Sequence, residues 1–273
     1  MHATAFVPGH VTGFFSTHPD EDPLRAGSRG GGVTLSHGVE TTATETSGIT
    51  LNGERVAVEP VERVLDALDA EFGVACETPL PLGSGFGVSG AMALGTAYVV
   101  NAETGAGRSA NDLVSIAHRA EVRSGTGLGD VVGQAQGGIP LRLEPGGPGY
   151  GRMDEIPGGA RVEYLSLGGL STADVLGGDT ETLSAAGERA LETVRERSTQ
   201  SVFIEASRQF AEEAGLLTDE LREILRSVDD AGATASMAML GETAFTLGTG
   251  LSDAGYDPEV CRTHPSGAGL RVE

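Results

Sequence analysis

A glycine-rich segment, Pro81-Leu82-Gly83-Ser84-Gly85-Phe86-Gly87-Val88-Ser89-Gly90-Ala91, constrains the fold of this chain more than any other feature. Glycine allows a backbone to approach a ligand closely and to adopt positive φ angles. The small residues from Ser89 onward predict a helix whose free N–H groups and positive dipole end point into the loop. A loop of this kind at a helix N-terminus is a typical anion site, and the usual anion is phosphate.

Three phosphate-binding interpretations of this segment compete with a plain glycine turn that binds nothing. Gly85-Phe86-Gly87-Val88-Ser89-Gly90 fits the dinucleotide pattern G-x-G-x-x-G, and Glu103 stands near the place of a ribose-binding acid. That pattern needs a strand directly before it, and Pro79 and Pro81 disfavour one. A Walker A loop needs lysine, and none occurs among the 18 basic residues. The third interpretation is the P-x-G-x-G-x-G-x-S-x-A loop of the GHMP small-molecule kinases, which the segment resembles closely.

Composition narrows the class of protein. With 273 residues the chain suits one large domain or two small ones. A net charge of −21 and a pI near 4.5 exclude general nucleic-acid binding through phosphate contacts. The 39 acidic residues beside no lysine are typical of proteins adapted to molar salt, which predicts a halophilic archaeal source.

The cysteines and the apolar segments predict where the protein resides. Cys76 and Cys261 lack metal-ligand spacing, so we expect reduced thiols of an intracellular protein. The N-terminus has no basic region, and no segment approaches the apolar length of a membrane span. We therefore expect a cytoplasmic protein with neither a membrane nor a nucleic-acid partner. The sequence leaves the oligomeric state open, a homodimer included.

Residue patterns predict a β-rich first third, with helices dominating later. Asn52-Gly53 is a strong hairpin signal, Pro60 opens a helix that Gly73 closes, and Ser109 caps another helix. The glycine- and proline-dense stretch 144–159 predicts a domain boundary, with domains 1–150 and 151–273. The predicted strands are Ala3–Val7, Val33–Ser36, Val39–Glu45, Ile49–Leu51, Arg55–Val58, Gly138–Leu143, Arg161–Leu167 and Gly269–Val272. The predicted helices are 60–73, Ala91–Val100, Ala110–Arg123, Thr182–Glu196, Ser201–Ala214 and Asp219–Val228, and an apolar stretch covers Ala235–Leu247.

Two N-terminal segments contain candidate substrate-binding residues. The first, Phe6–His18, includes His10 and His18, and by itself it reads as a strand that ends in a Pro-Gly turn. The second, Asp22–Gly32, includes Arg25, Ser28 and Arg29. A guanidinium group suits a carboxylate in bidentate geometry, although a solvated surface loop fits the second segment equally well.

Two carboxylates downstream of the glycine loop are candidates for phosphoryl-transfer chemistry. Glu121 lies on the predicted helix Ala110–Arg123, and Asp130 follows in the loop Ser124–Asp130. Phosphoryl transfer needs metal-bridged phosphates and an acceptor hydroxyl that is oriented and relieved of its proton. One carboxylate on Mg²⁺ and one beside the acceptor would meet both needs.

Four strings together resemble the archaeal pantoate kinases, a family of the GHMP kinase superfamily. They are residues 6–15 (FVPGHVTGFF), 22–30 (DPLRAGSRG), 83–91 (GSGFGVSGA) and 126–131 (TGLGDV). The resemblance covers nearly the whole chain. It implies an α+β, two-domain GHMP kinase fold, with an N-terminal α/β domain that carries the phosphate loop and a ferredoxin-like C-terminal domain. It also implies ATP-dependent phosphorylation of pantoate to 4-phosphopantoate in coenzyme A biosynthesis.

The resemblance also implies roles for individual residues. ATP would be bound by Pro81, Gly83, Ser84, Gly85, Gly87, Val88, Ser89 and Gly90. Ser89 and Glu121 would hold Mg²⁺, and Asp130 would accept or orient the acceptor proton. Pantoate would be bound by His10, His18, Arg25, Ser28 and Arg29, with His10 in place of the basic residue usual in the superfamily. The third superfamily motif is poorly kept, and its counterpart is Gly232–Gly241, where methionine replaces glycine.

Two other functions stay open on the sequence alone. Another GHMP kinase, acting on shikimate, homoserine or a mevalonate-like acid, would also use a hydroxyl acceptor. A non-catalytic nucleotide or ligand sensor could keep the same fold, although Asp130 and Glu121 speak against it.

Overall fold

The fold consists of two sheets with helices packed against them. The structure is a computed structural model, which describes residues 3–169, 180–239 and 241–271. The first elements are β1 (Thr4–His18), β2 (Gly27–Thr44), β3 (Ile49–Leu51), β4 (Glu54–Val56), α1 (Glu59–Ala67), β5 (Gly73–Glu77), α2 (Val88–Thr104), α3 (Ala110–Ser124), α4 (Asp130–Gln136), β6 (Ile139–Glu144) and β7 (Arg152–Ile156). The later elements are β8 (Arg161–Gly169), α6 (Thr180–Glu196), α7 (Gln200–Glu213), α8 (Asp219–Asp230), β9 (Ala235–Met237), β10 (Gly241–Leu247), α9 (Gly250–Asp253), β11 (Glu259–Arg262) and β12 (Gly269–Arg271).

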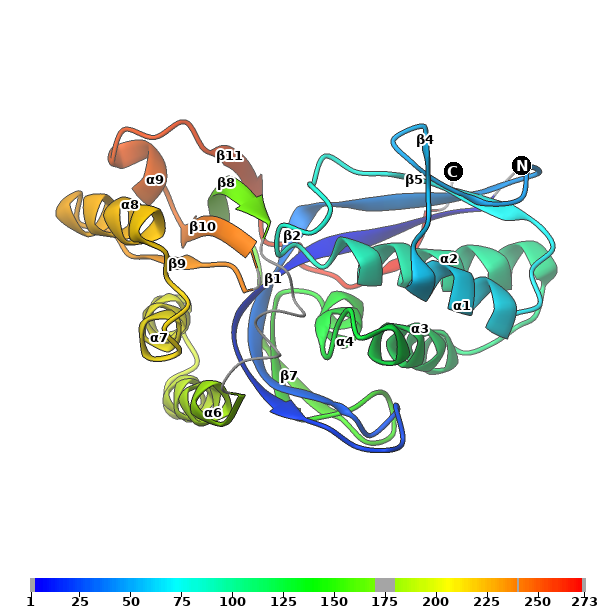
Figure 1. Ribbon diagram of the computed structural model, residues 1–273, viewed down its shortest axis with the longest axis horizontal. Helices are drawn as coiled ribbons and strands as arrows, with labels where there is room; N and C mark the ends of the chain where they lie inside the picture. The colour runs from blue at the N-terminus through cyan, green and yellow to red at the C-terminus, as the bar shows by residue number, and fades with distance from the viewer. Residues whose placement is uncertain (1–2, 170–179, 240, 272–273) are drawn as a thin grey trace.

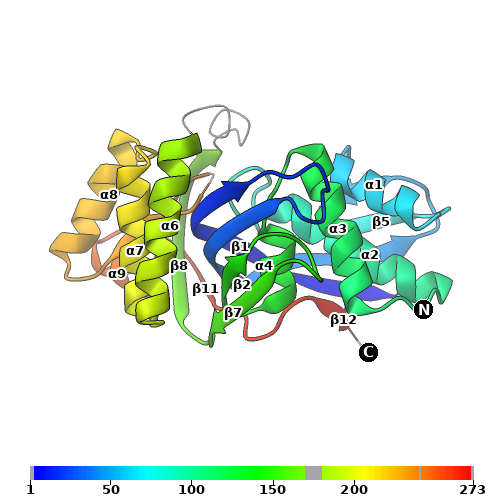
Figure 2. The ribbon, with the colours of Figure 1, turned by 90° about the horizontal axis from the view of Figure 1, so that it is seen from below.

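The larger sheet has the order β12-β1-β2-β5-β3-β4, with β6 paired to β2 and β7 paired to β6. Helices α1 to α4 lie on one side of it (Figure 1). Helices α6 and α7 also pack against β1, in the half of the molecule away from α1 to α3 (Figure 2). Because helices from both groups cover β1, its residues from Val7 to Ser16 are all buried.

The hairpin of β1 and β2 is much longer than the sequence predicted. The two strands have 15 and 18 residues, against about 5–6 in a typical strand. The predicted strands Val33–Ser36 and Val39–Glu45 are parts of β2, and Gly27–Gly32, expected in a loop, is strand as well. Glycine has low strand propensity, but pairing along the second half of β1 outweighs that preference here.

Local signals in the first half were mostly confirmed. Asn52 and Gly53 have φ of 50° and 83° and connect β3 to β4, as the hairpin signal predicted. Ser109 caps α3 through a capping box with Asp112. The helix that opens at Pro60 ends at Ala67, not near Gly73, because the chain turns into the left-handed conformation at Asp69, with φ of 50°.

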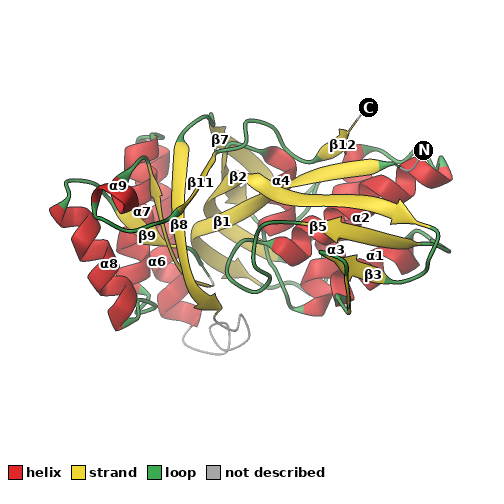
Figure 3. Ribbon diagram, turned by 90° about the horizontal axis from the view of Figure 1, so that it is seen from above, coloured by secondary structure: helices red, strands yellow, loops and turns green. Residues whose placement is uncertain are grey.

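The smaller sheet has the ferredoxin-like arrangement that the sequence resemblance implied. Its order is β11-β8-β10-β9 and every pairing is antiparallel. One helical connection lies between β8 and β9 and another, α9, between β10 and β11, which gives the β-α-β-β-α-β chain order (Figure 1). Figure 3 shows α6, α7 and α8 gathered beside β8 and β9. The apolar stretch Ala235–Leu247 folds as β9 and β10. The two sheets thus form two layered units that meet along β1 and β2.

Sheet membership bears on the predicted boundary at residue 150. β7 pairs with β6 and therefore continues the larger sheet to Ile156, and β12 returns to pair with β1. A division at 150 would cut the β6–β7 hairpin. We therefore propose a two-domain division with the crossing between β7 and β8, and with β12 counted with the first domain.

Two further observations concern the whole described chain. Cys76 and Cys261 are buried and unpaired, and burial raises the pKa of each thiol to about 11. Across residues 3–169, 180–239 and 241–271, no helix combines the length and the apolar character that a membrane span requires.

Candidate active site

The glycine loop connects β5 to the N-terminus of α2. Gly83, Gly85 and Gly87 have φ of 81°, 86° and 61°, in the region that favours glycine. Gly87 is the N-cap of α2, and no side chain caps the first N–H groups of this 17-residue helix. These N–H groups and the positive end of the helix dipole therefore remain available to an anion.

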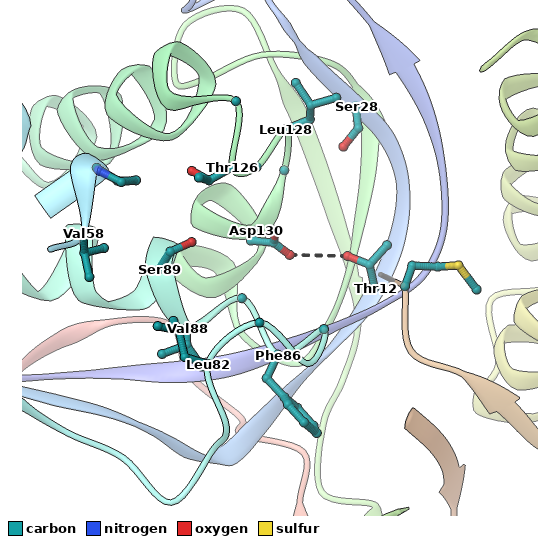
Figure 4. A pocket seen from close by; sticks show the side chains of 18 of the residues that line it. Thr12, Ser28, Val58, Leu82, Phe86, Val88, Ser89, Thr126, Leu128 and Asp130 are labelled. Atoms are coloured by element: carbon teal, nitrogen blue, oxygen red, sulfur yellow. Dashed lines mark hydrogen bonds between the residues drawn. The ribbon is translucent and has the colours of Figure 1, made fainter. Parts of the chain in front are cut away.

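A cavity of about 450 Å³ lies directly over this helix end. Figure 4 shows Val58 on one side of it, Ser28 and Thr12 on the other, and Thr126 and Asp130 between them, with Leu82 and Val88 together below Ser89. Its lining includes Gly83, Gly85, Gly87, Val88 and Ser89 from the predicted ATP-binding set, and Ser28 and Asp130. Pro81, Ser84, Gly90 and Glu121 do not line it, although they belong to the same segments.

Asp130 is the first residue of α4 and projects into the cavity. One carboxylate oxygen, Oδ1, lies 2.7 Å from His10 Nδ1 and accepts a hydrogen bond of 3.4 Å from Thr12 Oγ1. Burial by itself raises the pKa of this carboxyl group, but the hydrogen bond from His10 and the charge of Arg142 outweigh it and lower the pKa below its usual value. Asp130 is therefore ionised at neutral pH.

Glu121 lies in the last turn of α3, buried behind the cavity wall. Burial, followed by the negative charge of Asp130, raises its pKa to about 7, although hydrogen bonds from Ser89 and Thr126 act in the opposite direction. Its Oε1 atom is buried without a hydrogen-bond partner among the described residues. A Cβ atom on Gly127 would lie 2.3 Å from Glu121 Oε2 and 3.3 Å from Asp130 Oδ2, so both carboxylates face the same small space.

The residues around Glu121 fit a magnesium ion. A buried carboxylate with unused acceptor capacity, next to a serine hydroxyl and a phosphate-type loop, is the oxygen-rich environment that Mg²⁺ prefers. Within the described part of the chain, no cluster of three or more His, Cys, Asp or Glu forms a complete metal cage. Mg²⁺ commonly takes one or two protein carboxylates and completes its shell with waters and substrate phosphates.

Arg142 is a site residue that the sequence reasoning missed. It lies on β6, lines the cavity and is only 2% exposed. Its Nε donates to Ser28 Oγ at 3.1 Å, and Nη1 has no hydrogen-bond partner within the described residues. Burial lowers its pKa to about 10 against the opposing effect of Asp130, so the guanidinium stays charged at neutral pH. The available signal was a single arginine between Leu141 and Leu143, within the apolar run Ile139–Leu143 that precedes Glu144.

His10 lies behind Asp130, not in the cavity lining. It is fully buried, its Nδ1 faces Asp130, and its Nε2 has no partner among the described residues. Burial lowers the pKa of the imidazole despite the hydrogen bond and charge of Asp130. A neutral His10 that donates from Nδ1 would hold Asp130 in place, which differs from the substrate contact that we predicted.

The other three predicted substrate-binding residues lie away from the cavity. Arg25 is exposed, with its guanidinium carbon 4.9 Å from the centre of the Tyr150 ring. Arg29 and His18 both pair with Glu188 of α6. This arrangement ties the β1–β2 hairpin to α6, so the structure does not bring these residues together with Ser28 at the cavity.

Comparison with known proteins places these features in a wider group. Residues 55–138 match the sequence family described as the GHMP kinases N terminal domain. A pantoate kinase of Thermococcus kodakarensis is 38% identical over 267 residues, which covers 90% of this chain and 88% of the relative. A pantoate kinase of Methanospirillum hungatei is 32% identical, with 90% and 87% coverage.

Solved structures give the same picture. A protein described as a phosphotransferase related to the CoA biosynthesis pathway superposes with a TM-score of 0.88 at 33% identity, over 99% of both chains. A homoserine kinase from Cytophaga hutchinsonii has a TM-score of 0.69 at 17% identity, covering 99% of this chain and 97% of its own. At that identity the second likeness concerns the fold alone.

Proposed function

This chain belongs to the pantoate kinase family of the GHMP kinases, and on that premise we propose that its cavity holds ATP and pantoate with the pantoate 4-hydroxyl group beside Asp130. The protein is an ATP-dependent small-molecule kinase. In the reaction, the 4-hydroxyl oxygen of pantoate bonds to the γ-phosphorus of ATP, the bond from that phosphorus to the β–γ bridging oxygen breaks, and ADP leaves. The hydroxyl proton passes to Asp130, and 4-phosphopantoate is released.

The observation that carries this proposal is that an ionised carboxylate, Asp130, and a buried guanidinium, Arg142, line the same cavity. Asp130 is an ionised carboxylate with Oδ1 occupied by His10, which leaves Oδ2 for the acceptor proton. Arg142 supplies a buried positive charge with a free N–H group at Nη1. A hydroxy acid placed between them would meet a base at its hydroxyl end and a guanidinium at its carboxylate end, with Ser28 as a further hydrogen-bond partner.

The donor nucleotide would occupy the other end of the cavity. Its phosphates would accept hydrogen bonds from the N–H groups at the start of α2, which Gly87 leaves uncapped. The apolar side chains of Val58, Leu82 and Val88, on that side of Figure 4, would contact the nucleoside. The γ-phosphate would then lie between the glycine loop and Asp130, which is the in-line order that phosphoryl transfer requires.

Ser89 and Glu121 would hold Mg²⁺, with the remaining positions taken by phosphate oxygens and water. The ion, when bound, supplies charge neutralisation at the β- and γ-phosphates. Glu121 must be ionised for this role, and its raised pKa means that cation binding releases a proton near neutral pH.

A coupled assay of ADP release with pantoate, shikimate, homoserine and mevalonate tests the proposal, at constant high salt so that surface charges stay screened. We expect turnover with pantoate and 4-phosphopantoate as the product. Turnover with another acceptor but not pantoate would refute the acceptor assignment. ATP binding without turnover of any acceptor would indicate a non-catalytic ligand sensor.

A further inference from the structure

The acceptor side of the cavity has an apolar wall that the phosphate, metal and proton-transfer roles leave unexplained. Phe15, Leu128 and Met239 line the cavity together with Arg142 and Ser28. Phe15 and Met239 are nearly inaccessible, with 6% and 4% of their surface exposed. These three apolar side chains are called the acceptor wall below.

Sheet register places Phe15 and Arg142 on the two strands that flank β2. Gly30 of β2 pairs with Phe15 on one side and with Arg142 on the other. A Cβ atom on Gly30 would meet the backbone of Phe14 and Phe15, so glycine allows β1 and β2 to approach closely here. Phe15 and Arg142 both line the cavity, one strand apart on either side of this glycine.

A β-bulge in β1 brings Thr12 to the cavity beside Phe15. The pairing register of β1 shifts between Thr12 and Phe14, so Thr12 and Phe15 both line the cavity although they lie three positions apart. Thr12 donates to Asp130. The ring of Phe15 therefore lines the same cavity as Thr12 and Asp130, the residue to which we assign proton transfer.

Met239 and Leu128 complete the wall from two other segments. Met239 forms an isolated bridge with Thr12, and its N–H donates to the Thr12 carbonyl at 2.8 Å. It belongs to Gly232–Gly241, the poorly kept third motif, where methionine stands in place of glycine. Leu128 lies in the loop before Asp130 and projects beside Ser28 (Figure 4). These side chains give the cavity an apolar surface in addition to its charged groups, Arg142 and Asp130.

We propose that the acceptor wall recognises the two methyl groups on C3 of the acceptor, and that it makes the enzyme selective for a branched hydroxy acid. This inference rests on the proposed function. Pantoate has its two methyl groups on the carbon between the 2-hydroxyl carbon and the reacting CH₂OH group. With the carboxylate at Arg142 and the 4-hydroxyl at Asp130, that carbon falls at the level of the wall. A linear hydroxy acid would leave the wall wet.

The test compares pantoate with 2,4-dihydroxybutyrate, which keeps the carboxylate and both hydroxyl groups but lacks the methyl groups. Each buried methyl group contributes a factor of about 4 in binding. We therefore expect the wild-type enzyme to prefer pantoate by about 15-fold in kcat/KM. In Met239→Ala the preference should fall to about 4-fold or less, with the KM for ATP unchanged.

Two further variants separate recognition from folding. Met239→Leu conserves volume and apolar character, so it should retain most of the preference. Leu128→Ala alters a half-buried loop residue and leaves the core intact, and it should also reduce the preference for pantoate. It therefore provides the test if Met239→Ala fails to fold. Equal kcat/KM for both acceptors in the wild type, or an unchanged preference in a folded Met239→Ala or Leu128→Ala variant, would overturn the inference. Absence of turnover with either acceptor would refute the proposed function itself.

Discussion

Replacement of Arg142 by methionine tests the acceptor site most informatively, because it separates a functional charge from a structural one. Arg142 is 2% exposed, and its guanidinium donates one hydrogen bond to Ser28 and keeps Nη1 without a partner among the described residues. A hydrogen bond between charged groups contributes about 1.5–3 kcal/mol. We therefore expect Arg142→Met to raise the KM for pantoate about 10- to 100-fold and to leave the KM for ATP unchanged.

The stability of the same variant should change little, because two effects oppose each other. A buried and incompletely paired charge costs free energy, and its removal relieves that cost. The charge of Arg142 also favours the ionised form of Asp130, and this contribution is lost. Steady-state kinetics and thermal unfolding together provide the assay, and we expect a Tm close to that of the wild type while pantoate binding is weakened.

Two matched variants complete this experiment. Arg142→Lys keeps the charge but not the planar fork, so it should give an intermediate KM for pantoate. Arg25→Met removes an exposed arginine that stacks on Tyr150 outside the cavity, so it should change neither KM. A wild-type KM for pantoate in Arg142→Met, or a large increase in Arg25→Met, would refute the assignment of the carboxylate to Arg142.

Two more predictions concern the phosphate loop and the metal. Gly87→Val should abolish ATP binding in calorimetry, because a Cβ atom there would lie 3.0 Å from Gln134 and 3.2 Å from Asp130, at a backbone φ of 61°. Gly105→Val is the matched control, since Gly105 has nearly the same φ, 62°, but open space around it. This control should lose stability and retain ATP affinity. Equal ATP affinity in both variants would contradict the phosphate-loop assignment. Glu121 has a pKa of about 7, so Mg²⁺ affinity of the wild type should fall as pH drops below 7, whereas Glu121→Gln should bind Mg²⁺ weakly at every pH. Ser89→Ala should bind Mg²⁺ less tightly and lose affinity at a higher pH than the wild type, because the hydrogen bond from Ser89 lowers the pKa of Glu121. Because a raised carboxyl pKa stabilises the protonated folded state, the unfolding free energy of metal-free protein, taken relative to Glu121→Gln, should decrease by about 3 kcal/mol as pH rises from 4.5 to 7; a flat difference across that window would refute the raised pKa.

Local signals predicted the part of the site that is encoded in contiguous residues. The glycine loop, the helix after it, the cap at Ser109 and the neighbouring Glu121 and Asp130 each depend on short-range spacing. The structure brings the glycine loop, the start of α2 and Asp130 to one cavity wall and places Glu121 directly behind it, while Ser109 caps the far end of α3. Such features are accessible to sequence reasoning because backbone conformation at glycine and capping preferences act within a few residues.

Register explains what sequence reasoning missed. Arg142 reaches the cavity because β6 pairs with β2 opposite Gly30, a contact between residues more than a hundred positions apart in the chain. Arg29 and His18 are drawn instead to Glu188, which comes from a helix in the other half of the molecule. A scarce arginine in a glycine-rich segment does not reveal which long-range partner it will meet.

The extent of β2 was missed for a related reason. Its glycine-rich beginning, Gly27–Gly32, has poor intrinsic strand propensity and read as a loop. The strand forms because the buried β1 offers a full row of hydrogen-bond partners. Atoms of β1, together with Leu141 and Phe203 at Gly31, occupy the places where Cβ atoms would lie on the glycines 30–32. Tertiary context therefore outweighs local preference at the very segment that positions Ser28 and Gly30 at the acceptor site.

The rate of 4-phosphopantoate formation by Asp130→Asn, measured with ATP affinity on the same preparation, decides whether Asp130 takes the proton of the acceptor hydroxyl. Asparagine keeps the oxygen that accepts from His10 but removes the base, and general base catalysis contributes about 10²–10⁴-fold. We expect kcat to fall by about that factor while ATP affinity stays near the wild-type value, and we expect Asp66→Asn on the exposed side of α1 to change neither quantity. A near wild-type kcat in Asp130→Asn would exclude Asp130 as the proton acceptor.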